Sequence, residues 1–388
     1  MADIKSPRLD SIDLLRGIAM VVMALDHTRD FFHYARFDPL DLAQTTPILF
    51  ITRWITHHCA PAFVFLAGTG AFLSLSRGKT KSDLARFLLT RGIWLVFLEL
   101  TVVRLGWLFN LDYTFAFGQV IWAIGWSMVA LAGLIFLPRG VLAAVALGMI
   151  ACHNLFDGVD AASLGTFGWL WQIMHVQSAI EYAPGWVYWV AYPLVPWIGV
   201  IAAGYLFGSI IQTEEKQRRT TLYRLGFGMI GTFLVLRAVN VYGDPHPWAA
   251  QESTVKTVLS FVDTHKYPPS LLYLMMTLGP AIAVLPLLEG WKGKFADFLT
   301  TFGRVPLFYY VLHLFVIHAL AVAAAGITVG DASFLFSNLL PEQWPAEYGF
   351  NLGVVYLVWV TVILLLYLPC RWFARVKRER RAAWLSYL

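Results

Sequence analysis

Apolar runs long enough to cross a bilayer recur along the whole chain, and short polar stretches separate them. A hydrocarbon core about 30 Å thick needs about 20 helical residues per crossing. Ten segments have about this length, and we predict a transmembrane helix at each of them: 12–34, 47–76 with a bend at Pro61, 84–109, 118–137, 139–155, 187–211, 220–241, 269–288, 304–326 and 350–374. The pattern therefore predicts an all-α helical bundle in a membrane.

Lys and Arg are distributed unevenly between the loops. Basic runs occur at 77–81, 216–219 and 371–381, whereas the long loops 156–186 and 327–349 contain no Lys or Arg. Because cytoplasmic loops carry an excess of Lys and Arg, we predict that both termini are cytoplasmic and that residues 371–388 form a basic cytoplasmic tail. The net charge of +5 then reflects topology. No basic patch interleaved with aromatics indicates nucleic-acid binding.

Composition agrees with a membrane protein, since 58% of the residues are hydrophobic and only 14% are charged, against about 25% charged in soluble domains. No internal repeat interrupts the pattern, so we expect residues 1–388 to form one membrane domain. The N-terminus lacks a short apolar stretch followed by a small-residue cleavage site, so we expect no removed signal peptide. The predicted location is the bacterial inner membrane.

Ionisable residues within a span are costly and therefore indicate function by default. At the end of the first span, Asp26 and Asp30 are four residues apart, and His27 is three residues before Asp30. Helical spacing places these side chains on neighbouring surfaces. A carboxylate that holds a His fixes its tautomer and raises its basicity, as a general base requires. The alternative is an interfacial helix end whose charges reach water.

The second span contains Arg53 and His57, four residues apart on one helical face, whereas His58 points about 100° away. We therefore expect only one of the two histidines to face a site. An outer loop that closes onto the bundle is the alternative.

Two further cations, Arg237 and Lys266, lie where the positive-inside trend disfavours them, next to Asn240 and Tyr267. They require compensation by an anionic ligand, by a developing oxyanion or by acidic residues of other spans.

The ninth span places His313 near the middle of the membrane, one turn after Tyr309 and Tyr310. It is either a catalytic residue or a satisfied core residue. Glu99 of the third span is likewise either structural or functional. No HExxH or comparable ligand spacing occurs, so we expect no metal.

Several segments carry a family resemblance: LDSIDLLRGIA (9–19), LDHTRDFF (25–32), LFITRWITHHCAPAFVFLAG (49–68), QVIWAIG (119–125), YPLVPWIG (192–199), KYPPSL (266–271) and FGRVPLFYYVLH (302–313). In this order they resemble the DUF1624 membrane proteins, relatives of the heparan-α-glucosaminide N-acetyltransferase catalytic domain. The wider superfamily includes YeiB-like and acyltransferase-3 proteins. In acyltransferase-3 members an Asp-x-x-Arg motif precedes an essential His by eleven residues, as Arg16 precedes His27 here. The resemblance implies that His27 is the general base or acyl carrier and that Arg16 helps to hold the donor.

The first hypothesis is an acetyltransferase that takes acetyl from cytosolic acetyl-CoA and delivers it to an amine or hydroxyl of an extracytoplasmic, glucosamine-like sugar. Its expected catalytic residues are His27, Asp30, His57 and His313. Its expected donor- and substrate-binding residues are Arg16, Asp26, Arg53, His58, Arg237, Asn240, Lys266, Tyr267, Arg304 and Tyr310. Direct transfer and an acetyl-His intermediate both stay open.

The second hypothesis is a proton-coupled transporter of a small anionic solute, which would use the same buried charges. A structural scaffold is a third. The expected partners are the CoA donor, a sugar acceptor and the lipid bilayer. The oligomeric state is open, with a homodimer as one option.

Overall fold

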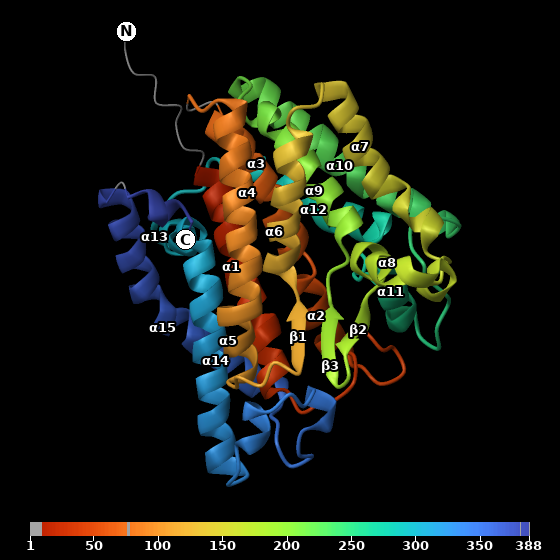
Figure 1. Ribbon diagram of the computed structural model, residues 1–388, viewed down its shortest axis with the longest axis vertical. Helices are drawn as coiled ribbons and strands as arrows, with labels where there is room; N and C mark the ends of the chain where they lie inside the picture. Colours follow the sequence, from red (N-terminus) through yellow and green to blue (C-terminus); the bar gives the residue numbers. More distant parts are fainter. Residues whose placement is uncertain (1–9, 76–77, 381, 388) are drawn as a thin grey trace.

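The computed structural model describes residues 10–75, 78–380 and 382–387, and helices make up 71% of the structure. Arg77 and Arg381 of the basic runs lie outside the described residues, as do residues 1–9 of the predicted cytoplasmic N-terminus. Figure 1 shows a bundle of steep helices, with a small sheet and several loops toward its lower end. We call the end where α1 begins the upper end and the end where α1 finishes the lower end.

Six helical segments among the described residues are long and apolar enough to cross a membrane. They are α2 with α3 (Pro47–Leu75), α9 (Leu194–Ile211), α10 (Glu215–Val239), α12 (Leu271–Leu288), α14 (Pro306–Thr328) and α15 (Leu352–Glu379). The predicted helical membrane bundle is thus confirmed. The count of ten crossings and their direction stay predictions.

The first helix, α1 (Asp10–Phe32), is as long as these but carries charged residues near both ends. It contacts α2, α3, α12, α13 (Lys294–Arg304), α14 and α15. Because neighbouring helices surround α1, its charges are shielded from lipid, where an unpaired charge would be expensive.

Three other predicted crossings are short or interrupted. The segment α4 (Lys81–Leu98) continues through a π-helical turn (Glu99–Val103) into α5 (Arg104–Leu108). The helices α6 (Val120–Leu134) and α7 (Arg139–Ala151) are shorter apolar helices. Two more short helices, α8 (Gly168–His175) and α11 (Thr254–Val262), lie at the right of Figure 1, at about mid-height.

A three-stranded sheet corrects the all-α prediction and the start of the span predicted at 187–211. Its strands are β1 (Phe115–Gly118), β2 (Ser178–Ala183) and β3 (Trp186–Val190), in the order β1-β3-β2. β2 and β3 form an antiparallel hairpin, and β1 joins β3 in parallel. Pro184 and Gly185 favour the turn, since Gly185 has φ +76°. The aromatic and β-branched run 186–190 then favours a strand.

The break in the second span also differs from the prediction. α2 ends at Thr56 and α3 begins at Cys59, so the interruption falls at His57 and His58 rather than at Pro61. Pro61 lies in the first turn of α3, where its missing N–H costs little. The carbonyl of His57 instead accepts a hydrogen bond from the Tyr273 hydroxyl at 2.7 Å.

α1 crosses α13 at two glycines that allow a close approach. A Cβ on Gly17 would lie 2.0 Å from the Leu299 carbonyl oxygen, and one on Gly303 would lie 1.8 Å from that of Asp13. Small residues at a crossing let helix backbones come together in this way.

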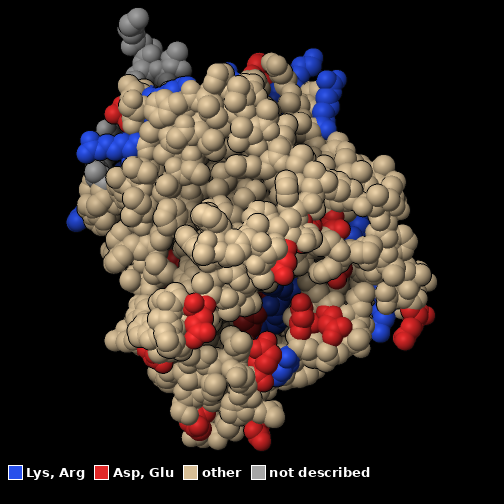
Figure 2. Space-filling model, turned by 45° about the vertical axis from the view of Figure 1, so that its right-hand side comes forward, with Lys and Arg blue, Asp and Glu red and all other residues tan. Residues whose placement is uncertain are grey.

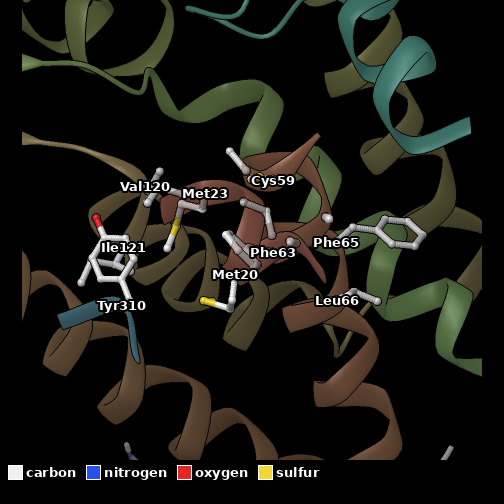
Figure 3. Packing of buried hydrophobic residues seen from close by; sticks show 14 of the residues in the cluster. Met20, Met23, Cys59, Phe63, Phe65, Leu66, Val120, Ile121 and Tyr310 are labelled. Carbon is white, nitrogen blue, oxygen red and sulfur yellow. The ribbon is translucent and has the colours of Figure 1, made fainter. Parts of the chain in front are cut away.

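Between the lower end of α1 and the upper end of the bundle, the core between the helices is apolar. Figure 3 shows Met20 and Met23 of α1 between Phe63 of α3 on one side and Ile121 and Tyr310 on the other.

Candidate active site

The last two turns of α1 carry a buried ion-pair network. Asp26 lies 2.7 Å from Nη1 of Arg29, one helical turn later, and 2.5 Å from Nη1 of Arg53 on α2. Nη2 of Arg29 also lies 2.5 Å from Asp30. Because removing one partner of a buried ion pair typically costs about 3–5 kcal/mol, this network holds α1 and α2 together at the lower end.

His27 lies beside this network and faces His313. The two ring centroids are 5.2 Å apart, and Nδ1 of His27 is 3.7 Å from Asp30. His313 is fully buried, its Nδ1 lies 3.1 Å from the Tyr309 carbonyl, and its Nε2 has no hydrogen-bond partner. A carbonyl can only accept, so Nδ1 carries the proton and the lone pair of neutral His313 is on Nε2. The rings of Trp107 and His27 are nearly perpendicular, and their centroids lie 4.8 Å apart.

A second polar group adjoins the network from α2 and from the loop before α12. His57 is 1% exposed, and neither of its ring nitrogens has a hydrogen-bond partner. It interacts electrostatically with Arg53, Lys266 and Asp26. The ring of His58 instead lies 5.1 Å from that of Trp54. His57, and not His58, therefore faces the charged cluster.

Lys266 is buried, with its Nζ 5.0 Å from the centroid of the Tyr267 ring. Burial alone would raise the pKa of the Tyr267 phenol, but the neighbouring cations Lys266 and Arg53 lower that pKa below its usual range. In Figure 2, Lys or Arg atoms lie at the floor of a hollow in the lower half, with Asp and Glu around its rim.

The side chains of Arg237 and Asn240 support a loop through hydrogen bonds to its backbone. The guanidinium of Arg237 donates to the backbone carbonyls of Phe261, His246, Ser260 and Asp263. The Asn240 side chain exchanges two hydrogen bonds with the backbone of Trp248, at 2.9 and 3.1 Å. Their donors and acceptors hold the segment that leads to Lys266. Glu99 is also structural in its contacts, since its Oε2 accepts the N–H of Trp122 at the start of α6, at 3.1 Å.

A large cavity opens at the upper end of the bundle. It has a volume of about 1290 Å³, larger than the roughly 300–1,000 Å³ of usual small-molecule pockets. The basic residues that line it are Arg16, Arg91, Lys294, Arg304, Arg371, Arg375, Lys377 and Arg378. Its apolar part reaches Tyr310, whose ring centroid lies 6.5 Å from that of His27. The cavity thus connects a basic mouth to the neighbourhood of the two histidines.

Comparison with known families supplies the identification. The family model of the heparan-alpha-glucosaminide N-acetyltransferase catalytic domain matches residues 8–237, more than half of the chain. The chain belongs to this family. A search of curated proteins found no match. Membership in the heparan-alpha-glucosaminide N-acetyltransferase family implies a membrane acetyltransferase, and the family in general uses acetyl-CoA as its donor.

The part of this family member that the family model matches includes Arg16, His27, Arg53 and His57, whereas Lys266 and His313 lie beyond it. The fold brings the two parts together, because α1 contacts both α12 and α14. The structure therefore gathers His27, Asp30 and His313, and it places His57 near Asp26 and Arg53 of the adjoining network. Their chemical roles stay predictions.

Sequence reasoning missed several residues of the cavity in this family member. Arg371, Arg375 and Arg378 were assigned to a basic tail, but α15 continues to Glu379 and these residues line the cavity. Their i, i+4, i+7 spacing, which places them on one helical face, was the available signal. Trp107 was missed because its contact with His27 joins α5 to α1, two helices that are far apart in the sequence.

Proposed function

We propose that this protein transfers the acetyl group of acetyl-CoA, bound in the upper cavity, to an amine or hydroxyl of a sugar that enters from the lower end. The observation that carries the proposal is the continuity of one cavity from a basic mouth to Tyr310, beside His27 and His313. Arg binds phosphate oxygens with paired donors. The phosphates of CoA can therefore bind at the basic mouth of the cavity, and the uncharged arm of CoA can lie in the apolar part.

The two imidazoles support acyl-transfer chemistry. In direct transfer, the acceptor N–H or O–H loses its proton to an imidazole as its heteroatom attacks the thioester carbonyl. The carbon–sulfur bond then breaks, and the imidazolium returns the proton to the CoA thiolate. His313 can act as this base, because the lone pair on its Nε2 has no hydrogen-bond partner. The indole N–H of Trp107 and the hydroxyl of Tyr310 adjoin the rings and would stabilise the oxyanion.

An acetyl-His27 intermediate is the competing mechanism. His27 would attack the thioester, CoA would leave as the thiol, and the acceptor would then take the acetyl group from the imidazole. Exchange of labelled CoA into acetyl-CoA without an acceptor distinguishes the two mechanisms, because only an acetyl-His27 intermediate can return its acetyl group to a second CoA thiol.

The charged cluster at the lower end suits the acceptor. Asp30 would accept a hydrogen bond from the neutral amine or hydroxyl of the acceptor, while Arg53 and Lys266 would donate to sugar oxygens. Lys and Arg gather at the top in Figure 2, and most Asp and Glu lie in the lower half. Under the positive-inside rule this distribution supports a cytosolic upper end in the bacterial inner membrane.

Labelled acetyl-CoA and glucosamine, added to purified protein in nanodiscs, test the proposal. We expect acetylglucosamine to form, and we expect His27→Ala and His313→Ala to abolish transfer while CoA binding by calorimetry persists. His246→Ala, an exposed histidine at the same end, is the matched control. Anion flux into proteoliposomes without acetyl transfer would instead support the transporter.

A further inference from the structure

A second cluster of potential ligands lies at the lower end of α7, away from His27. His153 belongs to the 3₁₀ turn after α7, Asp157 follows that turn, and His175 is the last residue of α8. One ligand atom from each of the three lies within 4.8 Å of those of the other two. No familiar motif has this sequence spacing, so the residues escape detection in the sequence.

The burial of this cluster points to a bound ion. His153 and His175 are each 3% exposed, and their rings meet at 5.4 Å between centroids. Although the backbone of Pro269 approaches the His153 ring, neither ring nitrogen has a hydrogen-bond partner. A buried polar group left unsatisfied costs about 1–3 kcal/mol. A metal ion would remove this cost by taking the imidazole lone pair.

The other two residues are arranged to share the same ion. Nε2 of His175 lies 3.0 Å from Oδ1 of Asp157. The remaining oxygen of Asp157 accepts a hydrogen bond from Asn154 at 2.9 Å, the type of contact that orients a metal ligand. The surrounding loop 156–186 has no Lys or Arg, so no basic side chain of that loop competes with a cation there.

We propose that His153, Asp157 and His175 bind a Zn²⁺ ion that fastens the loop after α7 to α8. Two imidazoles and one carboxylate are a common zinc set, and a water would complete four-coordination. With ligand distances of about 2.0–2.2 Å, ligand atoms in a tetrahedral site are about 3.3 Å apart. The longest separation must therefore contract by no more than about 1.5 Å, which side-chain rotation can supply.

This ion would also help to position residues on the proposed acceptor side of the bundle. The side-chain oxygen of Asn154 accepts the backbone N–H of Leu271 at 3.0 Å, at the start of α12. The loop with Lys266 and Tyr267 comes directly before that point. Zinc at the cluster would thus fix the base of this loop. The inference stands on the three ligands and does not require the proposed acetyltransferase activity.

Metal content and thermal stability test the site. The full chain, purified in detergent with a tag that contains no histidine, is stripped with a chelator and titrated with ZnSO₄ alone. We expect one Zn²⁺ per chain by mass spectrometry after gel filtration, and a melting temperature that rises with zinc, because an ion that binds only the folded state stabilises it. Mn²⁺ should compete poorly, as the usual order of divalent affinities requires.

Variants locate the ion independently of folding. His153→Ala should lose the bound zinc. Asp157→Asn keeps the shape of a partly exposed side chain and should weaken binding at least about tenfold, and Asn154→Ala, which removes the orienting contact, about 10–100-fold. His246→Ala removes a nearby exposed histidine outside the cluster and should leave binding unchanged. A folded wild-type protein without stoichiometric zinc would overturn the proposal, and so would zinc that survives both His153→Ala and Asp157→Asn.

Discussion

The crossing of α1 and α13 should be unusually sensitive to one methyl group. In Gly303→Ala the new Cβ would lie 1.8 Å from the Asp13 carbonyl oxygen, whereas ordinary contacts begin at 3.4 Å. The helices would therefore have to separate by about 1.6 Å (3.4 − 1.8). Overpacking of this kind costs about 1–3 kcal/mol and occasionally more.

The same displacement should weaken donor binding. Nη1 of Arg16 donates to the Gly303 carbonyl at 3.3 Å, and α13 carries Lys294 and Arg304 on the cavity wall. We expect Gly303→Ala to lower the melting temperature, followed by tryptophan fluorescence, and to raise the Kd for CoA in calorimetry roughly tenfold for each 1.4 kcal/mol lost.

Gly228→Ala on α10, where a Cβ meets nothing within 4 Å, is the control. It should gain stability by about 0.5–1 kcal/mol, as Gly to Ala does inside a helix, and leave CoA binding intact. A Gly303→Ala protein with the melting temperature and CoA affinity of the wild type would refute the close crossing.

Three further outcomes follow from the contacts. The double variant Arg371→Ala, Arg375→Ala should raise KM for acetyl-CoA more than KM for acetyl-pantetheine, because acetyl-pantetheine lacks the nucleotide phosphates. Arg224→Ala, which removes an exposed arginine outside the cavity, should change neither KM value. Equal effects of the double variant on both donors would contradict phosphate binding. Arg237→Lys should lower the melting temperature nearly as far as Arg237→Ala, because one ammonium cannot reach the carbonyls that the guanidinium holds; full stability of the Lys variant would contradict this role. Burial, together with Asp244 and Asp38, raises the pKa of Asp263 to about 7. The folded state therefore binds a proton that the unfolded state releases above about pH 4, and stability declines as pH rises toward 7; Asp263→Asn should remove this decline, so its advantage in melting temperature over the wild type should grow from pH 5 to pH 8.

The parts of the fold that the sequence predicts well depend on local pattern. Long apolar runs predict α9, α12 and α14 because a helix in lipid must satisfy its own backbone. The same reasoning fails at 187–193, where an apolar run forms β3 and the residues that follow it. A short apolar run does not distinguish a strand from a helix. The reasoning also fails at His57, where the helix is interrupted and the free backbone carbonyl accepts a hydrogen bond from Tyr273, 216 residues later.

The sequence likewise predicts one part of the candidate site and misses another. Asp26, His27 and Asp30 are close in the sequence, so helical spacing predicts their proximity. The approach of His313 to His27 depends on the packing of α14 against α1. Arg237 was expected to be compensated by an anionic ligand, an oxyanion or an acidic residue, and its burial alone does not distinguish these partners. In the structure its guanidinium meets backbone carbonyls and lies 3.8 Å from the Asp244 carboxylate. Only the positions of Ser260, Phe261 and Asp263 reveal these carbonyl partners.

The length of α1 links the two ends of the proposed reaction. Arg16 and His27 are eleven residues apart, which corresponds to about 16 Å along the helix. A donor whose charged group stays at Arg16 therefore needs a long uncharged arm to present its acyl carbon to His27. The wall between them is apolar, with Met20 and Ile121 on the cavity surface, so a charged arm would lose its hydration there. Both requirements select a donor built like acetyl-CoA over a compact acyl phosphate, whose phosphate and acyl carbon are too close together to reach both residues.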